Sequence, residues 1–308
     1  MRLASIDIGT NTLRLFICES HARRLKPLYK DRVITRLGGG FSQKKKLIPD
    51  SSIRRSIDAI SEFSRVIEKY RVERLRAVAT SVVRESANGD VFVGMVRDET
   101  GIDVEIISAT EEARFMVLGV LNSVVVESTR KVIIDIGGGS TEFVVLNGDV
   151  IENIISTNLG VVHLTEQFLG DKVAVKGDLE TLANFIDKSF KQNLSTEDLT
   201  SKKDLKLIAT AGTPTTLAAI EIGLKEYDAG LVNGFVLNRD AVNRIFNRLI
   251  RLTAEERLQV SGLEKGREDV IIPGTLILLK SMELFSTDEV IVSDGGLLEG
   301  IAISMINN

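Results

Sequence analysis

Several features that would assign the chain to a specialised class are missing from its sequence. Cys18 is the only cysteine in 308 residues, so no disulfide can form within the chain, and we expect a reducing, cytoplasmic setting. No apolar run reaches the ~18–20 residues of a membrane-spanning helix, and the N-terminal segment reads as a strand rather than a signal peptide. A net charge of −4 argues against a general nucleic-acid-binding protein. We therefore expect neither a membrane nor a nucleic acid among its partners.

The glycine-rich stretch 132–146 also lacks the marks of two common nucleotide-binding motifs. It has no Gly-Lys-Ser/Thr of a Walker A loop, and no helix follows its glycines as in a dinucleotide-binding unit. It reads as strand, tight turn, strand, and the glycines would let backbone N–H groups approach an anion without interference from a Cβ atom. The alternative is an ordinary glycine-rich hairpin. The polar residues of the stretch are Asp135, Gly137, Gly138, Gly139, Ser140, Thr141 and Glu142.

A second stretch of the same design opens the chain. The apolar run 3–8 contains Asp7, and the polar turn Gly9, Thr10 and Asn11 precedes a further strand. The length favours two domains of about 150 residues each. The repeated unit predicts two domains that present phosphate loops to each other across a cleft.

The rest of the chain alternates predicted strands with predicted helices, which indicates α/β layers with a mixed sheet in each domain. Residues 37–46, with three glycines and three lysines, read as a flexible basic loop. Residues 1–60 hold 13 Lys or Arg against 5 Asp or Glu. This excess either guides a polyanion or is an ordinary solvated face. A third small-residue turn, which contains Gly212 and Thr213, precedes a predicted helix.

Four segments resemble the exopolyphosphatase / guanosine pentaphosphate phosphohydrolase family, within the superfamily of acetate and sugar kinases, heat-shock chaperones and actin. The resemblance spans essentially the whole chain. It implies two actin-like (ribonuclease H-like) α/β domains with mixed five-stranded sheets flanked by helices and an active site in the interdomain cleft. We expect domains at 1–121 and 122–308, the last helix being free to pack back on the first domain. The segments are residues 6–12, 79–85, 108–114 and 134–142.

Hydrolysis of a phosphoanhydride needs a metal ion, donors around the transferred phosphoryl group and a group that activates water. Asp7, Asp135 and Glu142 are candidate Mg²⁺ ligands, because hard cations prefer oxygen. Arg84 is a candidate catalytic phosphate clamp; the alternative is a surface ion pair with Glu85 or Asp90. The candidate phosphate-binding residues are Gly9, Thr10, Asn11, Gly137, Gly138, Gly139, Ser140, Thr141, Gly212 and Thr213.

Glu111 and Glu112 are candidates for the residue that activates water, although acidic residues also suit the first turn of any helix. Resemblance to the family's Ser-Gly-x-Glu-Glu-Ala motif favours Glu112. Here Ala109 replaces the usual Gly, which leaves Glu111 open as the alternative. His163 stands where the family usually has Arg, so a permanently charged side chain is replaced by an imidazole.

We therefore expect a hydrolase that removes terminal phosphates from inorganic polyphosphate, guanosine pentaphosphate or both, with Mg²⁺ as cofactor, as a monomer or homodimer. One alternative is a small-molecule kinase or ATPase of the same superfamily. The other is a non-enzymatic, nucleotide-switched actin-like scaffold.

Overall fold

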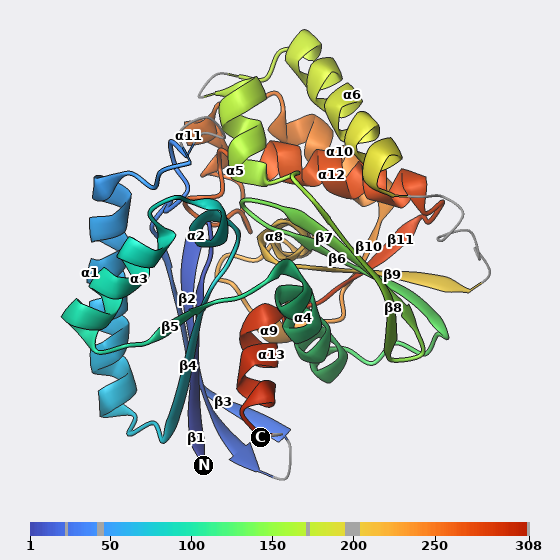
Figure 1. The fold of residues 1–308 in the computed structure, drawn as a ribbon. Helices are drawn as coiled ribbons and strands as arrows, with labels where there is room; N and C mark the ends of the chain where they lie inside the picture. The colour runs from blue at the N-terminus through green and yellow to red at the C-terminus, as the bar shows by residue number, and fades with distance from the viewer. Residues whose placement is uncertain (22–23, 42–45, 171–172, 195–203, 307–308) are drawn as a thin grey trace. The chain divides into compact units, whose positions relative to one another are not determined.

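The computed structural model describes residues 1–21, 24–41, 46–170, 173–194 and 204–306 (Figure 1). These residues form two compact units. Unit 1 comprises the described parts of Met1–Gly119 and Gly296–Asn308, and unit 2 comprises those of Val120–Gly295.

Unit 1 contains a mixed five-stranded sheet in the order β3-β2-β1-β4-β5. The central strand β1 pairs antiparallel with β2 and parallel with β4, and its mostly apolar sequence is typical of a strand covered on both faces. The first two turns of the chain are therefore the hairpin connections of a meander. The strands are β1 (Arg2–Ile8), β2 (Thr12–His21), β3 (Arg24–Ile34), β4 (Arg74–Ala79) and β5 (Val104–Ile106).

Helices cover both faces of this sheet. Ile6 and Ile8 belong to the core that also contains the apolar stripe of α1 (Asp50–Lys69) and residues of α3 (Gly89–Thr100). Side chains alternate along a strand, so Leu3 lies on the opposite face, in a cluster with Phe16 of β2 and residues of α13 (Leu297–Ser304). The buried stripe of α1 consists of Ile53, Ile57, Ile60 and Phe63.

Two further helices of the chain follow strands of this sheet. The five-residue helix α2 (Ser81–Glu85) comes directly after β4, where we expected only a turn, and α4 (Ala109–Ser123) follows β5. Near its end α4 approaches the start of α13 so closely that a Cβ added to Gly119 would lie 1.8 Å from the carbonyl oxygen of Gly296. No side chain fits at this position.

Unit 2 contains a six-stranded mixed sheet in the order β10-β11-β9-β6-β7-β8. The expectation of five strands was wrong by one, because β10 is a three-residue edge strand too short to leave a periodic signal. The strands are β6 (Arg130–Ile136), β7 (Thr141–Asn147), β8 (Val150–Thr157), β9 (Leu205–Thr210), β10 (Val236–Asn238) and β11 (Glu289–Val292).

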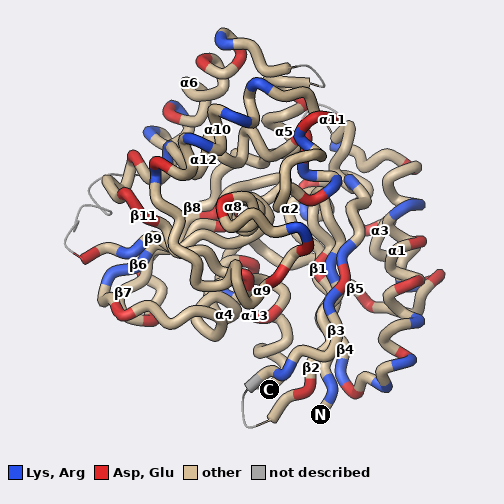
Figure 2. The backbone as a smooth tube through the Cα atoms, turned by 180° about the vertical axis from the view of Figure 1, so that it is seen from behind, with Lys and Arg blue, Asp and Glu red and all other residues tan. Residues whose placement is uncertain are grey.

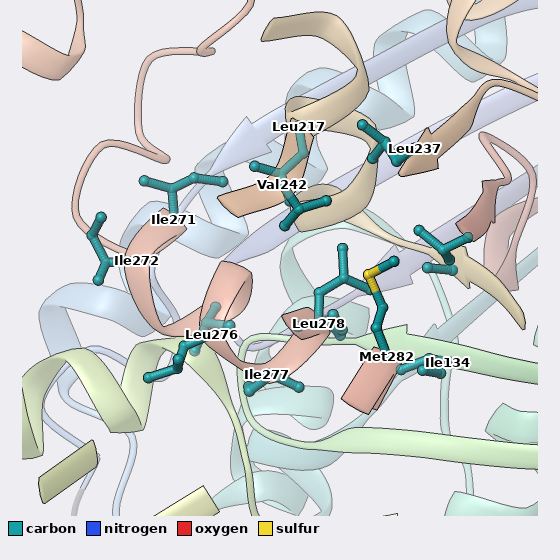
Figure 3. Packing of buried hydrophobic residues seen from close by; sticks show 14 of the residues in the cluster. Ile134, Leu217, Leu237, Val242, Ile271, Ile272, Leu276, Ile277, Leu278 and Met282 are labelled. Atoms are coloured by element: carbon teal, nitrogen blue, oxygen red, sulfur yellow. The ribbon is translucent and has the colours of Figure 1, made fainter. Parts of the chain in front are cut away.

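The core of unit 2 is built around α12, whose buried residues include Ile277, Leu278 and Met282 (Figure 3). They cluster with Ile134 of the sheet and Leu217 of α8, which ties the helices to the central strand. Residues 161–169 form a short α-helix, α5, followed by a π-helical turn. The helical segments are α5 (Val161–Leu164), the π-helix η1 (Thr165–Leu169), α6 (Lys176–Asn193), α8 (Gly212–Ile222), α9 (Ala229–Val232), α10 (Arg239–Leu249), α11 (Ala254–Arg257) and α12 (Ile271–Leu284).

Within the described ranges, no helix has the length and apolar character needed to cross a membrane. The basic N-terminal segment is only partly described, because Arg23, Lys44 and Lys45 lie outside the described residues. In the described part, basic and acidic positions both occur along α1 (Figure 2). The proposal of a polyanion track on this segment stays a prediction.

The glycine contact between α4 and α13 leads to a test of stability. Gly119→Ala should lower the free energy of unfolding by at least about 1–3 kcal/mol, because the new methyl group must push two backbones apart. Gly94→Ala, in the interior of α3, is the matched control, since nothing lies within 4 Å of its added Cβ atom. It should stabilise the protein by about 0.5–1 kcal/mol. Urea unfolding of both variants is the measurement. Equal changes in the free energy of unfolding would contradict the close approach of the backbones at Gly119 and Gly296.

Candidate active site

The first candidate phosphate loop, residues 9–11, is the turn between β1 and β2. The N–H group of Gly9 donates to the carbonyl oxygen of Thr12 at 3.1 Å. A Cβ atom added to Gly9 would lie 3.0 Å from the same oxygen, so the turn favours glycine. Closure of the turn leaves Thr10 and Asn11 at its tip.

A neighbouring segment, residues 36–41, holds this loop in shape. The N–H groups of Arg36 and Gly38 donate to the carbonyl oxygens of Asn11 at 3.0 Å and Thr10 at 2.8 Å. A Cβ atom at Gly38 would lie 2.4 Å from the Thr10 methyl carbon. The described part of the predicted flexible loop therefore differs from expectation: its start is packed on the phosphate loop, and Phe41 is buried.

Asp7, a candidate metal ligand, is buried at the end of β1 and forms an ion pair with Arg14. Its Oδ2 atom accepts hydrogen bonds from Nε of Arg14 at 2.8 Å and from Nη2. Oδ1 is buried, and no donor in the described ranges reaches it. We had not predicted Arg14 as a site residue, although the hairpin register pairs it directly with Asp7. A count of residues across the turn would have found it.

Arg84 and Glu112 meet, as a clamp and a base for one substrate would require. Nη1 of Arg84 donates to Oε2 of Glu112 and to the carbonyl oxygen of Ile107, both at 2.9 Å. The side chains are 23% and 12% exposed. The alternative partner Glu85 instead accepts a hydrogen bond from Ser81. Parallel pairing of β4 with β5 brings α2 and the start of α4 together.

Glu111 has a different role from its neighbour. Its carboxylate accepts hydrogen bonds from the N–H group of Ser108 at 3.0 Å and from the Ser108 hydroxyl at 2.8 Å. The Glu111 N–H group donates back to that hydroxyl oxygen. This is a reciprocal capping box at the start of α4. The bond from the Ser108 backbone, followed by that from its hydroxyl, lowers the pKa of Glu111 below its ordinary value.

The second candidate phosphate loop, residues 137–140, is fixed by hydrogen bonds that its carbonyl groups accept from the start of α5. The first N–H groups of α5, from Val161 and Val162, donate to the carbonyl oxygens of Gly137 at 3.1 Å and Gly138 at 3.0 Å. In a trans peptide the N–H group points away from the C=O group. The N–H groups of Gly138 and Gly139 therefore point away from α5, and neither has an acceptor in the described part of the chain. Such paired N–H groups suit an anion.

Close packing behind this loop requires a glycine. A Cβ atom added to Gly160, the residue before α5, would lie 2.2 Å from the carbonyl carbon of Gly139. His163, which stands where the family usually has Arg, lies within α5. Ser140 and Thr141 are both buried, and the Thr141 hydroxyl donates to the carbonyl oxygen of Leu159. The Thr141 hydroxyl group thus contributes to the shape of the loop.

Asp135 and Glu142 lie directly opposite each other in the β6–β7 ladder, so their side chains share one face. Glu142 is buried and accepts a hydrogen bond from Ser156 at 2.9 Å. Among the described residues, no group of three or more His, Cys, Asp or Glu side chains is arranged to hold a metal ion. Mg²⁺, however, commonly binds one or two carboxylates and takes its other ligands from water and phosphate. The Asp135–Glu142 pair fits that pattern, whereas Asp7 is already paired with Arg14.

The third candidate, the turn that contains Gly212 and Thr213, joins β9 to α8 and is strained. Ala211 adopts φ 71° and ψ −166°, a region that essentially only glycine occupies, at a cost of about 1–3 kcal/mol. The guanidinium group of Arg267 lies over Gly212, where an added Cβ atom would fall 1.4 Å from Nη1. Arg267 also bonds to Glu264 at 3.0 Å. No local sequence pattern connects Arg267 with this turn, because the two lie more than fifty positions apart.

The capping box predicts a pH-dependent contribution to stability. Ser108→Ala should cost about 0.5–2 kcal/mol at neutral pH, since it removes the cap of α4. The lowered pKa of Glu111 means that its charged form stabilises the folded state at pH values above about 4.5, and this contribution is lost as the pH falls through the folded-state pKa. The difference in the free energy of unfolding between wild type and Glu111→Gln should therefore become smaller below that pH. Urea unfolding across pH 3 to 7 tests this, and a constant gap would contradict it.

The chain as a whole is similar to known proteins. The chain is 34% identical over 311 residues to a bifunctional 3-dehydroquinate synthase/phosphatase of Fusobacterium nucleatum, covering 97% of this chain and 46% of that protein. It is 29% identical to exopolyphosphatase 2 of Mycobacterium tuberculosis, covering 99% of this chain and 98% of that protein.

Solved structures agree. An Aquifex aeolicus Ppx/GppA enzyme is 33% identical with a TM-score of 0.81, and 99% of each chain is covered. An exopolyphosphatase from Cytophaga hutchinsonii is 27% identical with a TM-score of 0.92, over 100% of this chain and 98% of that one. These neighbours confirm the predicted pair of actin-like α/β domains. The model of the Ppx/GppA phosphatase family matches residues 16–308, and the chain therefore belongs to that family.

Proposed function

We propose that this protein hydrolyses the terminal phosphoanhydride bond of inorganic polyphosphate, of guanosine pentaphosphate or of both. Relatives named exopolyphosphatase and guanosine-5'-triphosphate,3'-diphosphate pyrophosphatase support this substrate class. One observation carries the proposal: a largely buried carboxylate, Glu112, is held 2.9 Å from the arginine best suited to bind a phosphate, Arg84. A base beside an anion-binding cation is the combination that hydrolysis requires.

In the proposed reaction, the oxygen of a water molecule attacks the terminal phosphorus atom. Glu112 accepts the proton that the water loses. The bond between that phosphorus atom and the bridging oxygen breaks, and its electron pair stays on the oxygen of the remaining chain. The products are inorganic phosphate and a substrate shortened by one phosphate.

Backbone donors would bind the negative charge of the substrate. The N–H groups of Gly138 and Gly139 are the strongest candidates, because α5 already holds the carbonyl groups on the other side of the loop. Thr10 and Asn11 in the first loop, with Gly212 and Thr213 in the third, complete the proposed set. That the loops of the two units act together in a cleft stays a prediction from the sequence.

We propose Mg²⁺ as cofactor, held by Asp135 and Glu142, with Asp7 as a further candidate. When bound, the cation would offset the charge of the phosphate oxygens and so favour attack. The protein's own contribution is the placement of two carboxylates on neighbouring strands.

The base is tested by paired substitutions. Glu112→Gln should lower turnover on the order of 10²–10⁴-fold, because a neutral amide cannot accept the proton. Glu111→Gln is the matched control, since it removes only the charge of a capping residue and keeps a side-chain oxygen that can accept from Ser108, and it should remain active. Phosphate release from long polyphosphate and from guanosine pentaphosphate, measured side by side, is the assay. Activity in Glu112→Gln together with an inactive Glu111→Gln would reverse the assignment.

The metal proposal is tested by Asp135→Asn, which keeps the shape of the side chain and removes its charge. The Mg²⁺ concentration for half-maximal rate should rise, because a dication binds more weakly to a site that has lost one negative charge. Direct Mg²⁺ binding, measured calorimetrically, provides a readout apart from activity. Asp149→Asn, at an exposed carboxylate paired with Lys131, is the control. Unchanged Mg²⁺ binding and an unchanged titration would exclude Asp135 as a ligand.

A further inference from the structure

Arg84 uses only one of its guanidinium nitrogens to contact the protein. Nη1 donates to the Glu112 carboxylate and to the Ile107 carbonyl oxygen, so both of its hydrogens are engaged. These two bonds fix the plane and position of the group. The acceptors come from the residue that follows β5 and from the first turn of α4, and the pairing of β4 with β5 places this segment beside α2.

The remaining edge of the guanidinium group is open. An arginine carries five N–H donors, and the three on Nε and Nη2 have no acceptor among the described residues. The side chain is 23% exposed, so this edge is not sealed in the core. The Nε–Nη2 edge is a planar fork whose spacing matches two oxygens of one phosphate group.

Neighbouring acidic groups do not compete for that edge. Glu85, the next residue after Arg84 on α2, accepts its hydrogen bond from Ser81 at 3.0 Å. Glu111, next to Glu112, is bound by Ser108. Among the described residues, neither of these carboxylates is therefore the anion that would bind the Nε–Nη2 edge of Arg84.

We propose that Arg84 is a positioning residue: Nη1 fixes the Glu112 carboxylate, and the Nε–Nη2 edge binds two oxygens of the terminal phosphate. This inference rests on the proposed function. One rigid planar group would then set the spacing between the base and the phosphorus atom. The attacking water would be held between the base and the phosphorus atom. No flexible side chain would need to become ordered in each reaction cycle.

This arrangement makes a lysine a poor substitute. The ammonium group keeps the charge but is a single point with no fork. It can neutralise the phosphate or hold Glu112, but it cannot fix the distance between the two. Arg84→Lys should therefore lower kcat on the order of 10²-fold, with a smaller rise in KM.

The decisive experiment is a double-mutant cycle with Arg84→Lys and Glu112→Gln in the full-length protein. If Arg84 acts through Glu112, Arg84→Lys should change kcat less than about threefold once Glu112 is already glutamine. Inhibition by inorganic phosphate should weaken with Arg84→Lys in both backgrounds, because the open edge is lost in each. Arg54→Lys is the matched control, since Arg54 pairs with Glu99 on the surface. It should alter neither quantity.

Equal loss of kcat from Arg84→Lys in both backgrounds would overturn the positioning role and leave only anion binding. Unchanged inhibition by phosphate would overturn the open edge as a binding group. Wild-type protein that releases no phosphate from either substrate would instead refute the proposed function, and the positioning role with it. Thermal stabilisation by inorganic phosphate, compared between wild type and Arg84→Lys, would still report whether the edge binds an anion.

Discussion

Both candidate phosphate loops in hairpins depend on the same constraint: consecutive carbonyl groups of the loop accept hydrogen bonds from N–H groups of a second segment. In unit 1, residues 36 and 38 bind the carbonyl groups of Thr10 and Asn11. In unit 2, the start of α5 binds those of Gly137 and Gly138. Because a trans peptide directs its N–H group away from its C=O group, the loops are left with donors that point outward. The outward direction of these N–H groups thus comes from the segment behind each turn as much as from its glycines.

The two adjacent glutamates of α4 illustrate how one residue step changes function. Successive residues of a helix point about 100° apart, so only one of the pair can face Ser108 and only the other can face Arg84. Glu111 completes the cap, and Glu112 enters the ion pair. Acidic residues at a helix start are common for electrostatic reasons alone. The motif therefore combines Glu111, an ordinary capping residue, with Glu112, a largely buried carboxylate paired with Arg84.

The third turn differs from the hairpin loops, because its shape is held under strain. Ala211 occupies a backbone region suited to glycine, and Thr215 and Thr210 hydroxyl groups bind the surrounding carbonyl oxygens of Ala211 and Gly295. Arg267 rests on the glycine that follows. Strain of this kind persists only where the surroundings over-determine the conformation. The strained conformation of Ala211 thus lowers the stability of the folded state, and the contacts around this turn maintain its shape.

Much of this protein could be predicted from its sequence, because the signals are local. The β-branched runs that end at Asp7 and Asp135, the glycines that follow and the apolar stripe of α1 each reflect contacts or dihedral preferences within a few residues. The strands, the main helices and the positions of the loops followed from them. The partners of the polar side chains did not. Arg84 has Glu85 nearby in sequence, yet it binds Glu112, because strand pairing brings α2 and α4 together. Arg267 reaches Gly212, and β10 joins the sheet, through contacts that cross dozens of residues. Periodicity carries no information about such contacts. Only tertiary packing, which sets side chains from distant segments against each other, determined which charges became paired.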